Sequence, residues 1–295
     1  MEFISVKDWA QHNGVSERTA RNYCAQGKLT GACLVGKTWN IPAAAELPRR
    51  KNVSRVSPLL AALRKQKESR VKGGIYHRIQ IELTYNSNHM EGSRLTHDQT
   101  RYIFETNTIG ISNQCCVNVD DIIETANHFR AIDYIIDKTD GKLSEAYIKA
   151  LHMLLKTGTS DHRKDWFRVG DYKKLPNEVG GNDTTAPEDV RDEIRALLVE
   201  YNAKTKPALE DIIDFHQRFE AIHPFQDGNG RVGRLIMFRE CLRHEIVPFI
   251  ITEDLKIFYY NGLRNWPEIK GYLMDTCLAA QDNFKAILDK FRIKY

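Results

Sequence analysis

No stretch of the sequence is apolar for long enough to cross a lipid bilayer, and residues 1–10 lack the pattern of a signal peptide. Cysteine is scarce: the 295 residues include six cysteines, of which Cys115 and Cys116 are adjacent, and they form no C-x-x-C motif. This pattern argues against a disulfide framework and against a zinc site. We therefore expect a cytoplasmic bacterial protein with reduced thiols and no membrane partner.

Neither sign of charge dominates the whole chain, whose formal net charge is +4, but the charge is unevenly distributed. Residues 1–74 contain 14 of the 43 basic and 5 of the 39 acidic residues, so this segment has a net charge of +9 and the remainder −5. A contact with nucleic acid would therefore be sought in the N-terminal quarter. The hydrophobic content of 42% and charged content of 28% are typical of a globular chain with one large and one small domain.

The most informative segment is A-I-H-P-F-Q-D-G-N-G-R-V-G-R at residues 221–234. Gly228 and Gly230 permit the positive φ angles that let successive backbone N–H groups point at one anion. The residues that follow predict the start of a helix, where free N–H groups and the helix dipole favour a phosphate. Arg231 and Arg234 are three residues apart and share one helical face, as the binding of a polyphosphate requires.

The same segment carries two side chains suited to group transfer. A protein hydroxyl is a poor nucleophile at neutral pH, so a positioned imidazole such as that of His223 is a natural general base. Transfer to phosphorus mainly needs alignment and neutralisation of developing charge. Mg²⁺ binds one or two carboxylates together with phosphates and waters, so Asp227 alone is sufficient. Each feature has an ordinary structural explanation, but their combination in this order favours a nucleotide site.

These residues match every fixed position of the signature of the Fic family, His-Pro-Phe-x-Asp/Glu-Gly-Asn-Gly-Arg-x-x-Arg. The resemblance implies a mostly helical enzyme that transfers AMP from ATP to a protein hydroxyl, with His223 as the base and Asp227 as the Mg²⁺ ligand. It also implies that Arg231 binds the inner phosphates and Arg234 the γ-phosphate. The ATP-binding residues implied are Asp227, Gly228, Asn229, Gly230, Arg231, Arg234, Tyr259 and Tyr260.

A second motif precedes this region. Apolar residues at helical spacing from Ile75 predict a helix that ends near S-N-H-M-E-G at residues 87–92. The segment resembles the inhibitory motif Ser/Thr-x-x-x-Glu-Gly/Asn of one class of Fic proteins, with Ser87 and Glu91 at the fixed positions. Arg234 cannot give its guanidinium to both a glutamate and a γ-phosphate. We therefore predict that Glu91 restrains the enzyme; an ordinary exposed glutamate near a helix end is the alternative.

Residues 1–47 are expected to form a small winged helix-turn-helix domain. Ser5 would cap a first helix, Ser16 would cap a second one through about Ala25, and residues 34–42 suggest a hairpin wing. The layout resembles the winged domains of the MerR and excisionase type. A helix pair that serves protein docking or dimerisation is the alternative. The candidate DNA contacts are Arg18, Thr19, Arg21 and Asn22.

The remaining residues are expected to form a basic linker and a helical domain. Residues 48–74 are rich in Lys and Arg and predict an exposed linker, within which residues 59–67 could form a short helix. The Fic-type domain would occupy residues 75–295 and include the inhibitory helix at about 75–92. Apolar residues recur in this domain with the helical period of 3.6, so the fold class is expected to be mostly α. The further helices predicted are 96–104, 117–138, 144–155, 187–201, 209–221, one from 252, and 266–291.

Residues 166–181 interrupt this pattern, because apolar and polar residues alternate there over short distances and glycines bound the segment. Their position corresponds to the β-hairpin flap of Fic enzymes, whose edge can pair with an extended target segment. A long surface loop is the alternative. Tyr259 and Tyr260 could border an adenine, although two tyrosines on a helix are more often part of a core. The candidate target-docking residues are Lys174, Leu175, Pro176 and Asn177.

Several functions stay open at this point. The first is a Mg²⁺-dependent adenylyltransferase that modifies a Ser, Thr or Tyr hydroxyl of an unknown target protein or of itself. Glu91 could instead orient water and remove AMP, and another nucleotide or phosphocholine donor is also compatible. The alternative from a different class is a DNA-binding transcriptional regulator whose Fic core senses nucleotide, although a sensor has no need for His223. A homodimer would suit a winged DNA reader.

Overall fold

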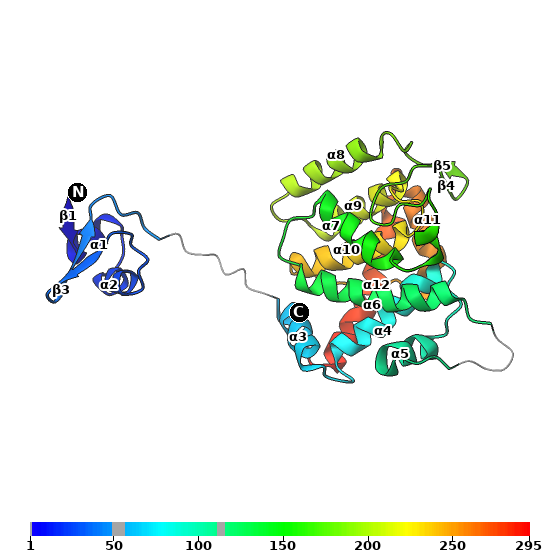
Figure 1. Cartoon of the computed structure of the whole chain (residues 1–295), viewed down its shortest axis with the longest axis horizontal. Coiled ribbons are helices and arrows are strands. Elements are labelled where there is room, and N and C mark those ends of the chain that lie inside the picture. The colour runs from blue at the N-terminus through cyan, green and yellow to red at the C-terminus, as the bar shows by residue number, and fades with distance from the viewer. Residues whose placement is uncertain (1, 49–56, 111–115) are drawn as a thin grey trace. The chain divides into compact units, whose positions relative to one another are not determined.

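The structure is a computed structural model that describes residues 2–48, 57–110 and 116–295. The chain divides into two compact units, Met1–Arg55 and Val56–Tyr295 (Figure 1). Of the helices in the described ranges, none has the length and apolar character that a membrane crossing needs. The five cysteines in these ranges are free thiols, and Cys115 lies outside the described residues.

The first unit combines a small sheet with two helices. Its antiparallel sheet has the strand order β1-β3-β2, and α1 and α2 pack beside β3. Ser5 and Ser16 accept a backbone N–H bond at the start of the two helices, as predicted. The strand β1 was not predicted, because three residues carry no periodicity of their own. The elements are β1 (Phe3–Ser5), α1 (Val6–His12), α2 (Glu17–Ala25), β2 (Cys33–Val35) and β3 (Thr38–Pro42).

The prediction of an exposed linker over residues 48–74 is wrong for its second half. Ser57 caps the helix α3 (Pro58–Ser69), and Leu59, Leu60 and Leu63 on this helix are buried in the core of the second unit. Three leucines on one helical face are more stable when they are removed from water, and Lys65, which follows them on the helix, is exposed. Residues 49–56 lie outside the described residues.

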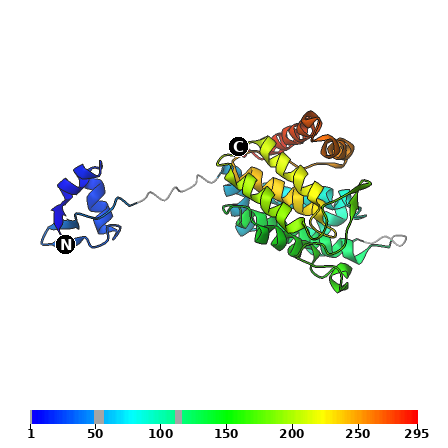
Figure 2. The ribbon, with the colours of Figure 1, turned by 90° about the horizontal axis from the view of Figure 1, so that it is seen from above.

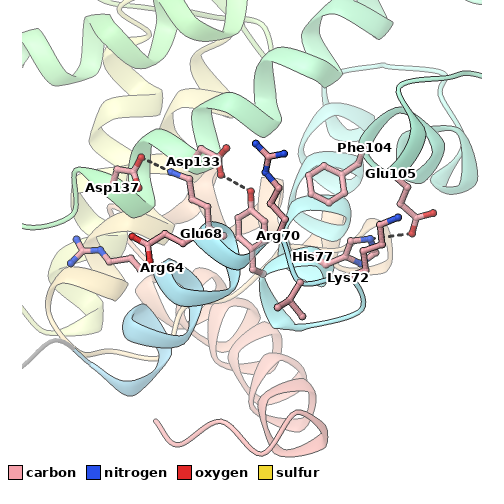
Figure 3. Close-up of a pocket in the computed structure, with 12 residues that line it drawn as sticks. Arg64, Glu68, Arg70, Lys72, His77, Phe104, Glu105, Asp133 and Asp137 are labelled. Atoms are coloured by element: carbon pink, nitrogen blue, oxygen red, sulfur yellow. Dashed lines mark hydrogen bonds and ion pairs between the residues drawn. The ribbon is translucent and has the colours of Figure 1, made fainter.

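Polar contacts also hold α3 in place, around a cavity of about 840 Å³ (Figure 3). Its walls come from α3, α4 (Ile75–Met90), α5 (His97–Thr106) and α6 (Val119–Asp137). Lys67 pairs with Asp137, and the Tyr76 hydroxyl donates to Asp133 over 2.7 Å. The 221–234 segment contributes no residue to this cavity.

The second unit is built around α10 (Asn229–Arg243), which is buried from Asn229 to Leu242. The helices α4, α6, α7 and α9 pack around it, and α11 and α12 lie side by side (Figures 1 and 2). A helix surrounded in this way is held rigidly, so its first turn is a fixed platform. The elements not yet given are α7 (Glu145–Lys156), α8 (Val190–Ala203), α9 (Leu209–Ile222), α11 (Lys256–Asn265) and α12 (Lys270–Lys290).

Most of the predicted helices are found, with shifted ends. Thr96 and Ser144 cap α5 and α7 as predicted. The helix expected from residue 187 begins at Val190, and the one expected from residue 252 begins with the short 3-10 helix Glu253–Leu255 before α11. These ends depend on contacts with distant parts of the chain, which periodicity does not report.

A hairpin begins inside the predicted flap region and ends two residues beyond it, and it lies later than the docking residues named for it. Its strands are β4 (Glu178–Val179) and β5 (Asn182–Asp183), joined by two glycines with positive φ. The predicted docking residues 174–177 precede the first strand. The glycine pair determines where the chain reverses.

Candidate active site

The 221–234 segment runs from the last turn of α9 into α10, and its histidine has a left-handed conformation. His223 ends α9 with φ 51°, and its Nδ1 lies 3.3 Å from the carbonyl oxygen of Glu220. Because a carbonyl only accepts, this contact places the proton on Nδ1 and leaves a lone pair on Nε2. Burial lowers the pKa of His223, so the imidazole is neutral at pH 7. That is the state a general base requires.

The turn that follows is closed by the side chain of Asn229. Its Oδ1 accepts from the Phe225 N–H over 2.8 Å, and its Nδ2 donates to the Phe225 carbonyl over 2.8 Å. Gly228 then starts α10 with φ 84°, and no described side chain caps this helix. The first N–H groups of α10 are therefore available to an anion, as predicted from the sequence.

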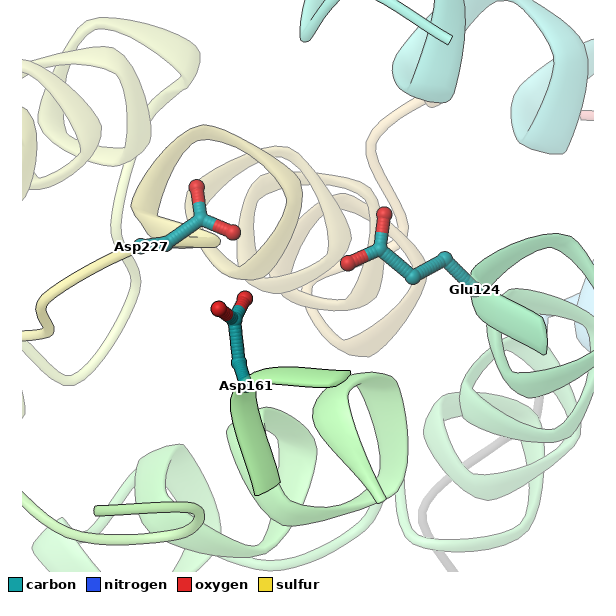
Figure 4. A group of neighbouring side chains, drawn as sticks. All are labelled: Glu124, Asp161 and Asp227. Atoms are coloured by element: carbon teal, nitrogen blue, oxygen red, sulfur yellow. The ribbon is translucent and has the colours of Figure 1, made fainter. Parts of the chain in front are cut away.

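Three carboxylates meet beside this helix start (Figure 4). Glu124 on α6, Asp161 on the 3-10 helix Ser160–Arg163 and Asp227 each direct an oxygen to one point, and these oxygens lie within 4.8 Å of one another. Lys156 at the end of α7 contacts all three, over 2.5 Å, 2.6 Å and 2.7 Å respectively. Arg231 pairs with Glu124 and, over 3.1 Å, with Asp227.

Asp227 stays ionised in this setting. Burial raises the pKa of a carboxyl, but the charges of Arg231 and Lys156 outweigh that effect and hold the pKa of Asp227 well below its usual range. Its side chain is 46% exposed, so one face of the carboxylate is open. A half-exposed carboxylate beside an open helix start fits a Mg²⁺ ion that takes its other ligands from phosphates and water.

Arg234 is held by the C-terminal end of α4. Its Nη2 donates to Glu91 Oε1 over 2.6 Å and to the Ser87 carbonyl over 2.9 Å, and its Nε donates to Ser87 Oγ over 3.0 Å. Burial lowers the pKa of Arg234, but the Glu91 charge raises it by more, so the guanidinium stays charged. The two residues predicted to be regulatory therefore both contact the second arginine of the motif.

Glu91 also covers the start of α10. A Cβ atom added to Gly230 would lie 2.2 Å from Glu91 Oε1 and 2.8 Å from Arg234 Nη1. The carboxylate therefore lies directly against the backbone where the sequence predicts an anion. One negative group therefore already lies beside Gly230 in the structure.

A cavity of about 510 Å³ opens between the hairpin, α9 and α11, and Glu220 and Tyr260 line it. Burial raises the pKa of Glu220 to about 8, so this carboxyl is mostly protonated at pH 7. Tyr259 does not line the cavity, contrary to the prediction. Its ring is 1% exposed and its hydroxyl lies 2.6 Å from His216 Nε2, because this side of α11 faces the core.

Two of the four predicted docking residues are tied to the turn of the motif. Asn177 Nδ2 donates to the Phe225 carbonyl over 3.1 Å, and the Leu175 N–H donates to Gln226 Oε1 over 3.3 Å. The buried Lys173 donates its N–H to the Pro224 carbonyl over 2.9 Å and its Nζ to Asn177 Oδ1 over 2.7 Å. Lys174 and Pro176 are exposed.

Sequence reasoning missed several residues of this site. His152 on α7 stacks on Phe225, with ring centroids 3.9 Å apart, and its Nε2 lies 3.2 Å from the Asp227 carbonyl oxygen. Lys156 and Lys173 are buried, although lysine is normally solvated. Their signal in the sequence is weak, because only the fold brings them to the motif.

The four candidate DNA contacts lie on α2 of the first unit. Arg18, Arg21 and Asn22 are exposed and Thr19 is half-buried. Arg21 pairs with Glu17 over 3.1 Å. Arg18 and Asn22 are one helical turn apart, so they can contact one ligand.

Comparisons with known proteins agree with this geometry. Residues 142–241 match the model of the Fic/DOC family. A protein adenylyltransferase Fic of Drosophila grimshawi is 27% identical over 229 residues, which cover 73% of this chain and 42% of that protein. Its counterpart in Drosophila mojavensis is 25% identical over 224 residues, which cover 73% and 40%. The chain thus spans less than half the length of these relatives.

Solved structures show the same fold. A Fic-domain-containing signalling protein from Bacteroides thetaiotaomicron superposes with a TM-score of 0.62 at 23% identity, over 78% of this chain and 94% of that one. Fic-1 (residues 134–508) from C. elegans superposes with a TM-score of 0.60 at 16% identity, over 79% and 72%. Residues 142–241 thus match the Fic/DOC family model, and the second unit has the fold of these solved Fic proteins.

Proposed function

We propose that the protein is an adenylyltransferase that moves AMP from ATP to a hydroxyl group of a target protein, and that Glu91 restrains this activity. One observation carries the proposal: a neutral imidazole, an open helix start and two buried guanidinium groups share one short segment. The relatives named as adenylyltransferases support the same reaction.

Each residue of the site has its own role in the proposed reaction. The target hydroxyl oxygen attacks the α-phosphorus while His223 Nε2 accepts the hydroxyl proton. The bond from the α-phosphorus to the bridging oxygen breaks, and pyrophosphate leaves with the electron pair. The first N–H groups of α10 and Arg231 stabilise the charge on the phosphates. Asp227 would hold Mg²⁺, which when bound neutralises further phosphate charge.

Glu91 acts through Arg234. While Arg234 donates to Glu91, it cannot bind a γ-phosphate, and the carboxylate repels phosphate from Gly230. ATP then binds in a pose in which its α-phosphorus is out of line with the hydroxyl. A displacement of about 1 Å lowers a rate on the order of a hundredfold.

Incubation with ATP labelled at the α-phosphate tests this function. We expect label on protein with Glu91→Gly and much less with the unchanged chain. His223→Ala in the Glu91→Gly background is the control, because it keeps the phosphate site and removes the base. Equal labelling by the two variants, or transfer of label from the γ-phosphate, would show that a different reaction takes place. Loss of label from AMP-modified protein would indicate de-AMPylation instead.

We propose further that the first unit binds DNA through α2. Arg18 and Asn22 are exposed on one helical face, and the hairpin of β2 and β3 follows, as in a wing. The basic residues concentrated in residues 1–74 would add contacts with phosphate.

A further inference from the structure

We propose that Lys156 fills a three-carboxylate cation site, and so confines divalent metal ions to the outer oxygen of Asp227. The proposal rests on the proposed function for the metal that Asp227 would hold. The structural fact behind it is that a side-chain cation stands at the point where three acidic groups converge.

The geometry around Lys156 resembles that of a bound metal. An ammonium group has three N–H donors, and each has its own carboxylate here, from Glu124, Asp161 and Asp227. The Nζ–oxygen distances of 2.5–2.7 Å are only slightly longer than calcium–oxygen distances of about 2.3–2.6 Å. The side chain is 2% exposed, so water does not compete for these contacts.

The charges make this cation necessary. Three carboxylates converge, and Arg231 balances only part of their charge from one side. Lys164 contacts Asp161 from the exposed side over 2.6 Å. Without Lys156, three carboxylate oxygens within 4.8 Å of one another, two of them on mostly buried side chains, would carry an excess of negative charge, which is a costly state unless a cation enters.

The position of Lys156 determines which oxygen of Asp227 a metal can use. Asp227 Oδ2 accepts from both Lys156 and Arg231, which leaves Oδ1 of this half-exposed side chain as the oxygen that neither cation uses. A metal ion therefore gains only one protein oxygen and needs phosphates to complete its coordination. Lys156 acts here as a positioning residue: it prevents a metal from settling in the inner site in the absence of nucleotide.

Titration of the full chain with Mn²⁺ alone, followed by calorimetry and by electron paramagnetic resonance, tests the proposal. For Lys156→Met we expect Mn²⁺ to bind at least about tenfold more tightly than to the unchanged protein, because an inner three-carboxylate site is vacated. We also expect Mn²⁺ to raise the melting temperature of this variant. Lys149→Met is the matched control, because Lys149 lies on the same helix but pairs with Glu145 and Asp171.

Three results would overturn the proposal. The first is Mn²⁺ binding to Lys156→Met that is no tighter than binding to the unchanged protein or to Lys149→Met. The second is a gain that persists when Asp161→Asn is added, since that change removes one of the three ligands. The third is a Lys156→Met chain that stays unfolded at every Mn²⁺ concentration. None of these measurements contains ATP, so a failure of the proposed AMP transfer would not affect them.

Discussion

At the scale of single residues, the site depends on burying charged and titratable groups next to one another. His223 contacts the Glu220 carbonyl and Lys173 the neighbouring Ile222 carbonyl, and burial is the largest cause of the pKa shift of His223, Glu220 and Lys173. Burial lowers the pKa of Lys173 to about 8, so this lysine is still mostly charged at pH 7. Its positive charge helps to lower the pKa of His223. The imidazole is thus kept neutral by its surroundings.

This arrangement predicts a pH dependence. A general base works when it is deprotonated, so the rate of AMP transfer should rise with pH through the pKa of His223 and be level by pH 7. Lys173→Met removes a positive charge beside the imidazole, so the rising limb should move to higher pH by roughly half a unit to one unit. The measurement is the pH profile of kcat/KM in the Glu91→Gly background.

The neighbouring lysine provides the control for that profile. Lys174→Met changes an exposed side chain and should leave the profile in place. A merely structural role of Lys173 would lower the rate at every pH without moving the limb. An unmoved limb in Lys173→Met would therefore contradict the electrostatic account.

At the scale of elements, the sequence predicted what depends on local contacts. The helix starts at Ser16, Thr96 and Ser144 followed from cap residues and periodicity, and the open start of α10 followed from the glycines of the motif. The contact of Glu91 with Arg234 followed from a motif resemblance. The capped helix starts need little information from distant parts of the chain, whereas the Glu91–Arg234 contact joins residues 143 apart in sequence and was predicted only through the motif.

Other features that depend on the tertiary fold were not predicted. A basic, lysine-rich stretch suggested a solvated linker, yet the leucine face of α3 is buried in the core. Lys156 and His152 reach the site from α7, and Tyr259 faces the core while Tyr260 faces a cavity. In each case the packing partner is far away in sequence, so no local pattern identifies it.

The placement of α3 can be tested by its stability contribution. Leu63 is fully buried, so Leu63→Ala should lower the free energy of unfolding of the second unit by about 2–5 kcal/mol. Denaturant unfolding of the full chain measures this. Val71→Ala is a matched control at an exposed position just after the helix and should change stability little. A negligible effect of Leu63→Ala would restore the exposed-linker interpretation.

At the scale of the whole molecule, two compact units with different proposed ligands share one chain. If α2 binds DNA, then Arg18→Ala in the full chain should weaken binding and lower the slope of log K against log salt by about one. Gel shift with genomic fragments at several salt concentrations measures both. Arg163→Ala, on a surface of the second unit, is the comparison. Unchanged binding and slope in Arg18→Ala would contradict DNA recognition by this helix.

The central claim is that Glu91 and the γ-phosphate of ATP compete for Arg234, and the ratio of ATP affinity to ADP affinity tests it most directly. Calorimetry on the unchanged chain and on Glu91→Gly measures this ratio, because ADP lacks the group for which the competition is proposed. The account predicts that the ratio rises about tenfold in Glu91→Gly, as expected for the gain of one charge-assisted contact. Equal gains for ATP and ADP, or no gain for either, would contradict it.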